Sequence, residues 1–208
     1  TSKYVFFRRY VGKAIFSQKV KAIFFSEFSY FSCLSSSIHN EWVRSTSGSR
    51  GASSVEYSLG KSFGTFPFPI TMAPNADSVG EKYYELREKI CRQMSVGPTE
   101  LYNRLNDKSA SNEDIHELRT LRIELDKAVL ASYGWTDIDP SHDFYEVSYL
   151  PESDRMRFTI AEAARVEVLR RLSDLNRHRY EQEVGAGPHK AAKKPTSGGR
   201  RSKPATRD

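Results

Sequence analysis

The chain has 208 residues, a formal net charge of +6 at pH 7 and a hydrophobic fraction of 38%. This length allows one or two domains. The longest apolar run near the start is Ala22 to Phe25, which is far too short for a secretory signal or a membrane-spanning helix. Only two cysteines, Cys33 and Cys91, are present, and this low number favours a reduced, cytoplasmic protein.

The positive charge is concentrated at the two ends of the chain. Residues 1–23 carry six Lys or Arg and no acidic residue, and residues 185–208 also have a net charge of +6. A basic segment on one side is the electrostatic footprint of a phosphate-contacting surface. The alternative is a solvated face together with a tail that aids solubility. The tail has no large apolar residue, so it is predicted to be disordered.

The N-terminal quarter is rich in strand-forming residues. Ten of the twelve Phe lie in the first 70 residues, and residues 4–7 and 20–25 are dense in aromatic and β-branched side chains. Such segments favour β-strands. We therefore expect residues 1–25 to form the incomplete edge of a larger sheet, which would need a partner.

Residues 28–69 are the most distinctive stretch. The first part predicts one amphipathic helix, whose apolar stripe consists of Tyr30, Phe31, Leu34, Ile38 and Trp42. The opposite, polar face consists of Ser35, Ser36, His39 and Glu41. A Ser/Gly-rich loop over residues 44–54 carries two arginines, and residues 55–57 are a short strand candidate. The prolines alternating with Phe in residues 66–69 predict a rigid, extended exit.

The remainder of the chain predicts mainly helices. Apolar residues at spacings of three and four indicate a helix over 78–95, Thr99 is a natural N-cap for a second helix, and a third runs from Glu113 to Tyr133, with Gly134 just beyond its end. After one plausible strand at residues 144–149, a capping box at Thr159 and Glu162 begins a last helix that reaches about Val184. The five arginines of the last two long helices alternate with acids, which predicts solvated faces or intramolecular pairs, with phosphate contact as the lesser alternative: Arg119, Arg122, Arg165, Arg170 and Arg171.

The fold class expected from these elements is α+β. We expect three regions, namely 1–70 as a partly β, mixed segment, 71–184 as a mainly helical body, and 185–208 as a disordered basic tail.

Several of these motifs resemble one family. The pattern FxxLxSxxHxxWxR, then the Ser/Arg-rich loop, a short strand and FxTFPFP are similar to a segment near the C-terminus of large adenine-specific DNA methyltransferases of the Type IIG and MmeI-like restriction–modification and phage-defence systems. The matching residues are Phe31, Leu34, Ser36, His39, Trp42, Arg44, Tyr57, Phe63, Thr65, Phe66, Pro67, Phe68 and Pro69. Helical motifs further along the chain extend the resemblance to about residues 25–183.

The resemblance implies the end of a target-recognition domain followed by a helical tail. Such enzymes use S-adenosylmethionine, but the glycine-rich cofactor turn and the Asn/Asp-Pro-Pro-aromatic motif do not occur in this sequence. We therefore expect no catalytic residue, no cofactor and no metal in this chain. The implied partners are double-stranded DNA and the methyltransferase portion of the same enzyme.

Two kinds of DNA contact are expected. The candidates for phosphate contact are Arg8, Arg9, Lys13, Lys19 and Lys61. The candidates for base reading are the loop residues Arg44, Ser47, Ser49 and Arg50, with His39 beside them, because arginine can bond guanine bidentately in the major groove. Arg44 could equally be a helix C-terminal cation that interacts with the helix dipole. Two alternatives stay open: a helical interaction or scaffold module, and a gene remnant without independent function.

Overall fold

The computed structural model describes residues 3–13, 15, 20–47 and 54–185. The class is α+β, as predicted, with six α-helices and one two-stranded sheet among these residues. The helices are α1 (Phe28–Ser35), α2 (Ser37–Thr46), α3 (Ala76–Gln93), α4 (Pro98–Leu105), α5 (Glu113–Ser132) and α6 (Glu162–Gly185), with a π-helical turn η1 (Leu59–Phe63) and a 3-10 turn η2 (Glu152–Asp154). The strands are β1 (Asp143–Glu146) and β2 (Met156–Thr159).

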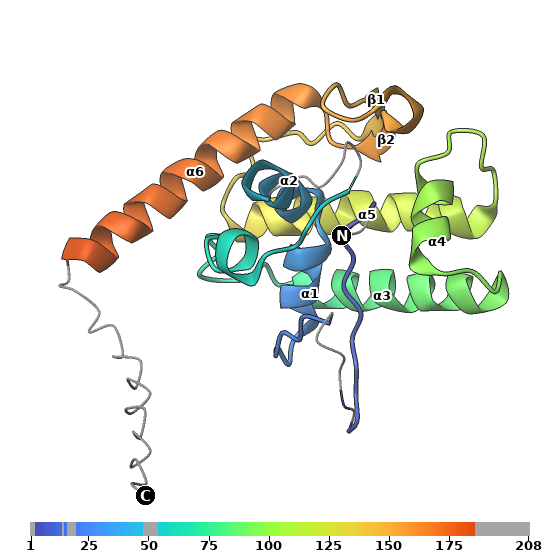
Figure 1. The fold of residues 1–208 in the computed structure, drawn as a ribbon, viewed down its shortest axis with the longest axis horizontal. Helices are drawn as coiled ribbons and strands as arrows, with labels where there is room; N and C mark the ends of the chain where they lie inside the picture. Colours follow the sequence, from blue (N-terminus) through green and yellow to red (C-terminus); the bar gives the residue numbers. More distant parts are fainter. Residues whose placement is uncertain (1–2, 14, 16–19, 48–53, 186–208) are drawn as a thin grey trace, which may run out of the picture.

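An antiparallel pair of long helices, α3 and α5, forms the centre of the fold (Figure 1). The apolar stripe predicted for α3, Val79, Tyr83, Leu86, Ile90 and Met94, is confirmed for its first four residues, which are buried, whereas Met94 is the C-cap and is only partly buried. The end of α5 is also as predicted. Gly134 has a φ of +72°, and the N–H of Trp135 donates to Leu130 O at 3.0 Å, which satisfies a carbonyl of the last turn.

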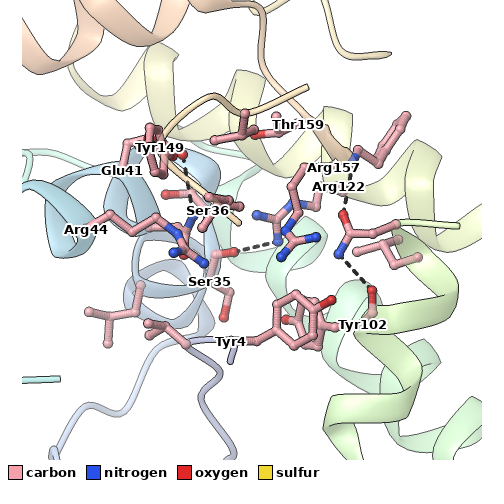
Figure 2. Close-up of a pocket in the computed structure, with 18 residues that line it drawn as sticks. Tyr4, Ser35, Ser36, Glu41, Arg44, Tyr102, Arg122, Tyr149, Arg157 and Thr159 are labelled. Carbon is pink, nitrogen blue, oxygen red and sulfur yellow. Dashed lines mark hydrogen bonds between the residues drawn. The ribbon is translucent and has the colours of Figure 1, made fainter. Parts of the chain in front are cut away.

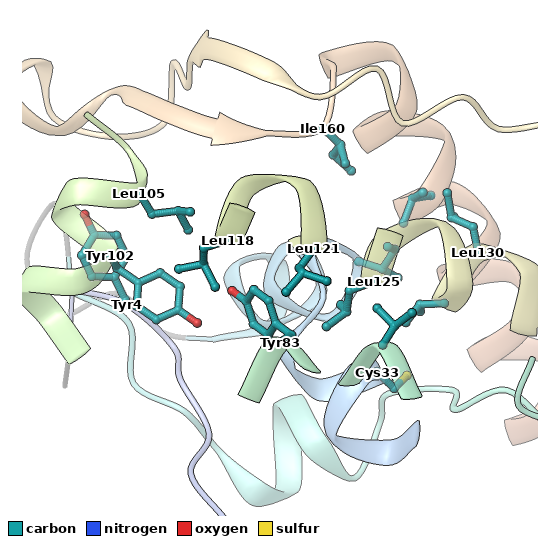
Figure 3. Packing of buried hydrophobic residues seen from close by; sticks show 14 of the residues in the cluster. Tyr4, Cys33, Tyr83, Tyr102, Leu105, Leu118, Leu121, Leu125, Leu130 and Ile160 are labelled. Atoms are coloured by element: carbon teal, nitrogen blue, oxygen red, sulfur yellow. The ribbon is translucent and has the colours of Figure 1, made fainter. Parts of the chain in front are cut away.

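One hydrophobic core joins nearly all the helices (Figure 3). It includes Tyr4 from the N-terminal segment, Cys33 from α1, Leu125 from α5 and Leu172 from α6. Residues from both sides of the predicted boundary at residue 70 therefore share a single core.

The predicted helix over residues 28–42 is two helices. Ser36 has extended backbone angles, φ −70° and ψ 160°, and it separates α1 from α2. Its hydroxyl donates to Cys33 O at 2.6 Å and accepts the N–H of His39 at 3.1 Å. The same side chain thus ends one helix and caps the next, which is a role typical of serine outside helix interiors.

The polar face assigned to this segment does not face solvent. Ser35, Ser36, His39 and Glu41 are all buried, because α1 packs against α3 and α5, and α2 packs against α5 and α6. The four polar residues opposite the apolar stripe therefore belong to the interior of the protein.

The predicted strands over residues 4–7 and 20–25 do not form within the described part of that segment. Side chains of α3 occupy the carbonyls that a neighbouring strand would use, since Arg87 donates to Phe7 O at 3.0 Å and Tyr84 donates to Arg9 O at 3.3 Å. The strand expected at residues 55–57 is also absent, and Val55 forms only an isolated bridge.

The sheet lies instead near the C-terminal end of the body. The strand predicted at residues 144–149 begins one residue earlier and is shorter, and its antiparallel partner β2, pairing Phe144 with Phe158, was missed. Thr159 is the last residue of β2 rather than a helix cap, and α6 begins at Glu162. Similarly, α4 begins at Pro98, with Gly97 rather than Thr99 at the N-cap.

Helix α6 extends beyond the body (Figure 1). Its first half buries Ala164, Val168 and Leu172, and Arg165, Arg170 and Arg171 form the intramolecular ion pairs expected of them. No helix among the described residues is long and apolar enough to cross a membrane. The predicted basic tail lies outside the described residues from position 186 onwards.

Candidate nucleic-acid interface

Hydrogen bonds connect the two ends of the Ser/Arg-rich loop. The loop leaves from the end of α2, and the chain returns through η1. Ser47 Oγ lies 2.9 Å from Ser62 Oγ, which is fully buried in η1, and Thr46 Oγ1 donates to the same atom at 3.4 Å. Within η1, Ser58 Oγ accepts the N–H of Lys61 at 3.1 Å. The two ends of the intervening segment are therefore fixed relative to each other.

His39 packs among the aromatic side chains Phe7, Tyr57 and Phe66. Its ring packs edge-on against Phe66, with ring centres 4.5 Å apart, and against Phe7 at 5.8 Å. Its Nε2 lies 3.2 Å from Tyr57 Oη, whereas its Nδ1 has no hydrogen-bond partner among the described residues. Burial lowers the pKa of His39 to about 3, so the ring is neutral at pH 7.

The extended exit packs as its sequence predicts. Phe66 is buried and contacts both His39 and Trp42, and Phe68 packs edge-on against Phe66 with ring centres 4.9 Å apart. The carbonyl of Thr65 accepts a hydrogen bond from Asn176 Nδ2 at 2.6 Å, which attaches the exit to α6. His39, Trp42, Phe66 and Phe68, four of the residues that carry the resemblance, therefore pack together.

The predicted DNA-contacting residues fall into two separate groups. Arg44, Ser47 and Lys61 lie around the base of the loop, and the Lys61 side chain is exposed. Arg44 is half-buried and donates to Lys3 O at 3.4 Å, which is a weak hydrogen bond. Lys19, Ser49 and Arg50 lie outside the described residues.

The second group runs along α3 rather than beside the loop. Arg8 pairs with Glu88 at 2.5 Å, and the guanidinium of Arg9 lies 4.5 Å from the centre of the Phe28 ring. Lys13 is exposed. Exposed ion pairs are worth about 0–1 kcal/mol, so Arg8 can exchange Glu88 for a phosphate at little cost.

His39 does not belong to either surface. It is fully buried, and its ring contacts Phe7, Tyr57 and Phe66, so the His39 side chain is not exposed for contact with DNA. The position of His39 opposite the apolar stripe suggested that its side chain is exposed. The side chain is buried because α1 and α2 pack against the rest of the body.

A cleft lined by arginines lies on another side of α2 (Figure 2). It has a volume of about 50 Å³ and lies between the N-terminal segment, α2, the end of α4, α5 and the sheet. Arg44 enters it from α2, Arg122 from α5 and Arg157 from β2. Glu41 lines the same cleft, and Tyr149 donates to its carboxylate at 2.8 Å.

Of the two alternatives predicted for the α5 arginines, a solvated face is wrong, since Arg119 and Arg122 are buried and make intramolecular hydrogen bonds. Arg119 donates to four main-chain carbonyls around the end of α4. Arg122 donates to Ser35 O and to the Tyr83 hydroxyl. The position of Arg122 within the apolar stripe of the helix was the sequence feature that indicated its burial. No such feature indicated the burial of Arg157, because its strand was not predicted.

No group of three or more His, Cys, Asp or Glu within the described residues could hold a metal ion. No family model, curated protein or solved structure matches this chain.

Proposed function

We propose that this chain contributes DNA binding and target recognition to an adenine-specific DNA methyltransferase of the restriction–modification type. The observation that carries the proposal is the clamped base of the Ser/Arg-rich loop, where Ser47 and Ser62 are 2.9 Å apart. A loop on a rigid scaffold is the usual location of binding residues. Arg44, Ser47 and Lys61 surround that base, and Arg50 lies within the loop sequence.

The catalytic part of the proposed enzyme lies outside this sequence, which has neither the cofactor turn nor the amino-group motif of such methyltransferases. The N-terminal segment supports a partner that covers it. Several of its large apolar side chains are highly exposed, namely Val11, Ile15, Val20 and Phe24. Such exposed apolar surface is typical of an interface, and the methyltransferase portion of the same enzyme is the partner that the proposal provides.

The test is fluorescence anisotropy of the full chain with a labelled duplex of mixed sequence, titrated at several salt concentrations. We expect binding that weakens steeply with salt. Lys61→Ala should lower the affinity for all sequences and reduce the slope of log K against log salt by about 0.9, because one phosphate contact is lost.

The matched control is Lys108→Ala, an exposed lysine in the turn between α4 and α5. It removes the same charge at a position away from the loop, so its salt slope should equal that of the parent. An absence of duplex binding at low salt would overturn the proposal in favour of the interaction module. Equal effects of the two substitutions would show that the loop base does not contact DNA.

A further inference from the structure

The arginine cleft contains hydrogen-bond donors that the protein itself does not use. Arg122 and Arg157 have exposed fractions of only 8% and 9%. Nevertheless, Nε of each has no hydrogen-bond partner among the residues that the structure describes, and neither does Ser35 Oγ. Leaving a buried polar group unsatisfied costs about 1–3 kcal/mol, and more for a charged group. The three groups belong to residues that line one cleft, which points to a ligand that accepts hydrogen bonds.

The carboxylates near the cleft do not fill this role. Asp154 lies 3.0 Å from Arg157 Nη2 but is shared with Lys3, whose Nζ is 2.7 Å away. Its single charge is therefore divided between two cations. Asp126, behind Arg122, accepts hydrogen bonds from Ser37 N and lies 2.7 Å from His142 Nε2.

Glu41 is the remaining acid of the cleft. Its carboxylate already accepts a hydrogen bond from Tyr149 and lies 3.9 Å from Arg165. Burial raises the pKa of Glu41 above its ordinary value, against the opposing effects of Tyr149, Arg44 and Arg165. The Glu41 carboxylate therefore already has a hydrogen-bond donor and a cation beside it.

The neighbouring tyrosine, Tyr102, lies close to two arginines. Burial raises its pKa, whereas Arg87, Arg122 and a hydrogen bond with Tyr83 lower it, and the pKa lies below its ordinary value. Tyr102 also lines the cleft. A positive, donor-rich site favours an anion.

The size of the cleft restricts that anion. A volume of about 50 Å³ has room for a few water molecules or for one small tetrahedral group. It is far below the roughly 300–1,000 Å³ of pockets that enclose drug-sized ligands. Arginine forks match the oxygens of phosphate bidentately.

We propose that the cleft between α2, α5 and β2 is a binding site for a single phosphate group, held by Arg44, Arg122 and Arg157. The loop proposal shares Arg44 with this site, whereas Arg122 and Arg157 line the cleft and are not part of the loop proposal. The phosphate could belong to a nucleic-acid backbone or to inorganic phosphate and its monoesters, and both present the same oxygens to the arginines.

The test is isothermal titration of the full chain with inorganic phosphate and, separately, with a thymidine dinucleotide that carries one phosphodiester. Both titrations are made at constant ionic strength, with chloride as the reference anion. We expect saturable binding of at least one of the two over about 0.1–10 mM. Binding of the dinucleotide would assign the site to a nucleic-acid backbone, and binding of inorganic phosphate alone would assign it to a free or terminal phosphate.

Arg44→Gln and Arg157→Gln should each weaken that binding by about tenfold or more, since each removes charge-assisted hydrogen bonds. Arg44 makes one weak hydrogen bond, at 3.4 Å, so this variant keeps the fold, and circular dichroism checks it. The matched control is Arg92→Gln, an exposed arginine of α3, which should bind like the parent. Absence of saturable binding, or parent-like binding by Arg44→Gln, would overturn the proposal. If duplex DNA binds normally to the Arg44→Gln and Arg157→Gln variants, the loop proposal stands without this one.

Discussion

His142 Nε2 lies 2.7 Å from Asp126 Oδ2, and both side chains are almost completely buried. The other oxygen of Asp126 accepts the N–H of Ser37 at 2.7 Å, at the first residue of α2. Asp126 therefore joins three segments, since it lies on α5 and holds both the start of α2 and the residue before β1. Substitution of such a buried carboxylate is strongly destabilising, because its partners are then left buried without a hydrogen bond.

We expect Asp126→Ala to destabilise the fold by about 3 kcal/mol or more, because it leaves His142 and the Ser37 N–H unpaired in the core. Urea unfolding measures this difference. The control is Asp174→Ala on α6, which breaks only exposed ion pairs with Arg170 and Arg177 and should change stability by less than about 0.5 kcal/mol. A loss below about 1 kcal/mol for Asp126→Ala would contradict the assigned role.

His39 should make stability depend on pH. Burial lowers its pKa from 6.5 to about 3, so between these values the unfolded chain binds a proton that the folded chain does not. This contribution is fully present above about pH 6.5 and is lost as the pH falls, by up to about 1.4 kcal/mol per unit.

We expect His39→Gln to remove that part of the slope. The measurement is the free energy of unfolding at about pH 7.5, 6.5 and 5.5 for parent and variant, whose difference cancels the other titrating groups. His116→Gln, at an exposed position of α5, should leave the slope as it is. Equal slopes for the parent and His39→Gln would contradict burial of the imidazole.

Gly80 should not tolerate a side chain. Alanine usually stabilises a helix relative to glycine by about 1 kcal/mol. At Gly80, however, a Cβ would lie 2.7 Å from Phe28 O and even closer to Ser32 Oγ. Ser32 cannot turn away freely, because it donates to Ala76 O at 2.6 Å.

We therefore expect Gly80→Ala to destabilise the protein by about 1–3 kcal/mol through separation of α1 from α3. Gly60→Ala is the control, since a Cβ there meets nothing within 4 Å. Thermal and urea unfolding give both values. A stabilised Gly80→Ala variant would mean that α1 does not pack closely on α3.

Arg50 gives the sharpest test of sequence reading. If the loop reads a base, Arg50→Ala should cost about 1–3 kcal/mol on a site selected from a random pool, and much less on a scrambled duplex. Arg8→Ala should instead weaken both duplexes alike, because phosphate contacts carry no sequence information. Parent-like binding of both duplexes by Arg50→Ala would favour the interaction module.

Methyl transfer should be absent from the purified chain. The sequence has no glycine-rich cofactor turn and no amino-group motif. Incubation with labelled S-adenosylmethionine and mixed-sequence duplex should leave the DNA unlabelled. Reproducible incorporation of label would show that the chain has its own catalytic site.

The sequence by itself determined the long helices and their buried stripes. In α3 and α5 the apolar residues recur with the period of a helix, and Gly134 terminates α5, so local pattern and backbone chemistry agree. The aromatic exit at Phe66 and Phe68 was predictable for the same reason, because proline restricts its own backbone whatever surrounds it.

The tertiary structure determined which polar groups are buried and where the short strands form. Ser36 could continue a helix or cap one. Its local bonds with Cys33 O and His39 N form the cap, and Asp126 of α5, which accepts the Ser37 N–H, holds the start of α2 from a distant part of the chain. Arg122 is buried because carbonyl and hydroxyl acceptors from α1, α2 and α3 converge on it. Residues 4–7 have the composition of a strand but bond to side chains of α3 instead. Strand pairing and charge burial both depend on partners far away in the chain, and these partners meet only after the helices have packed.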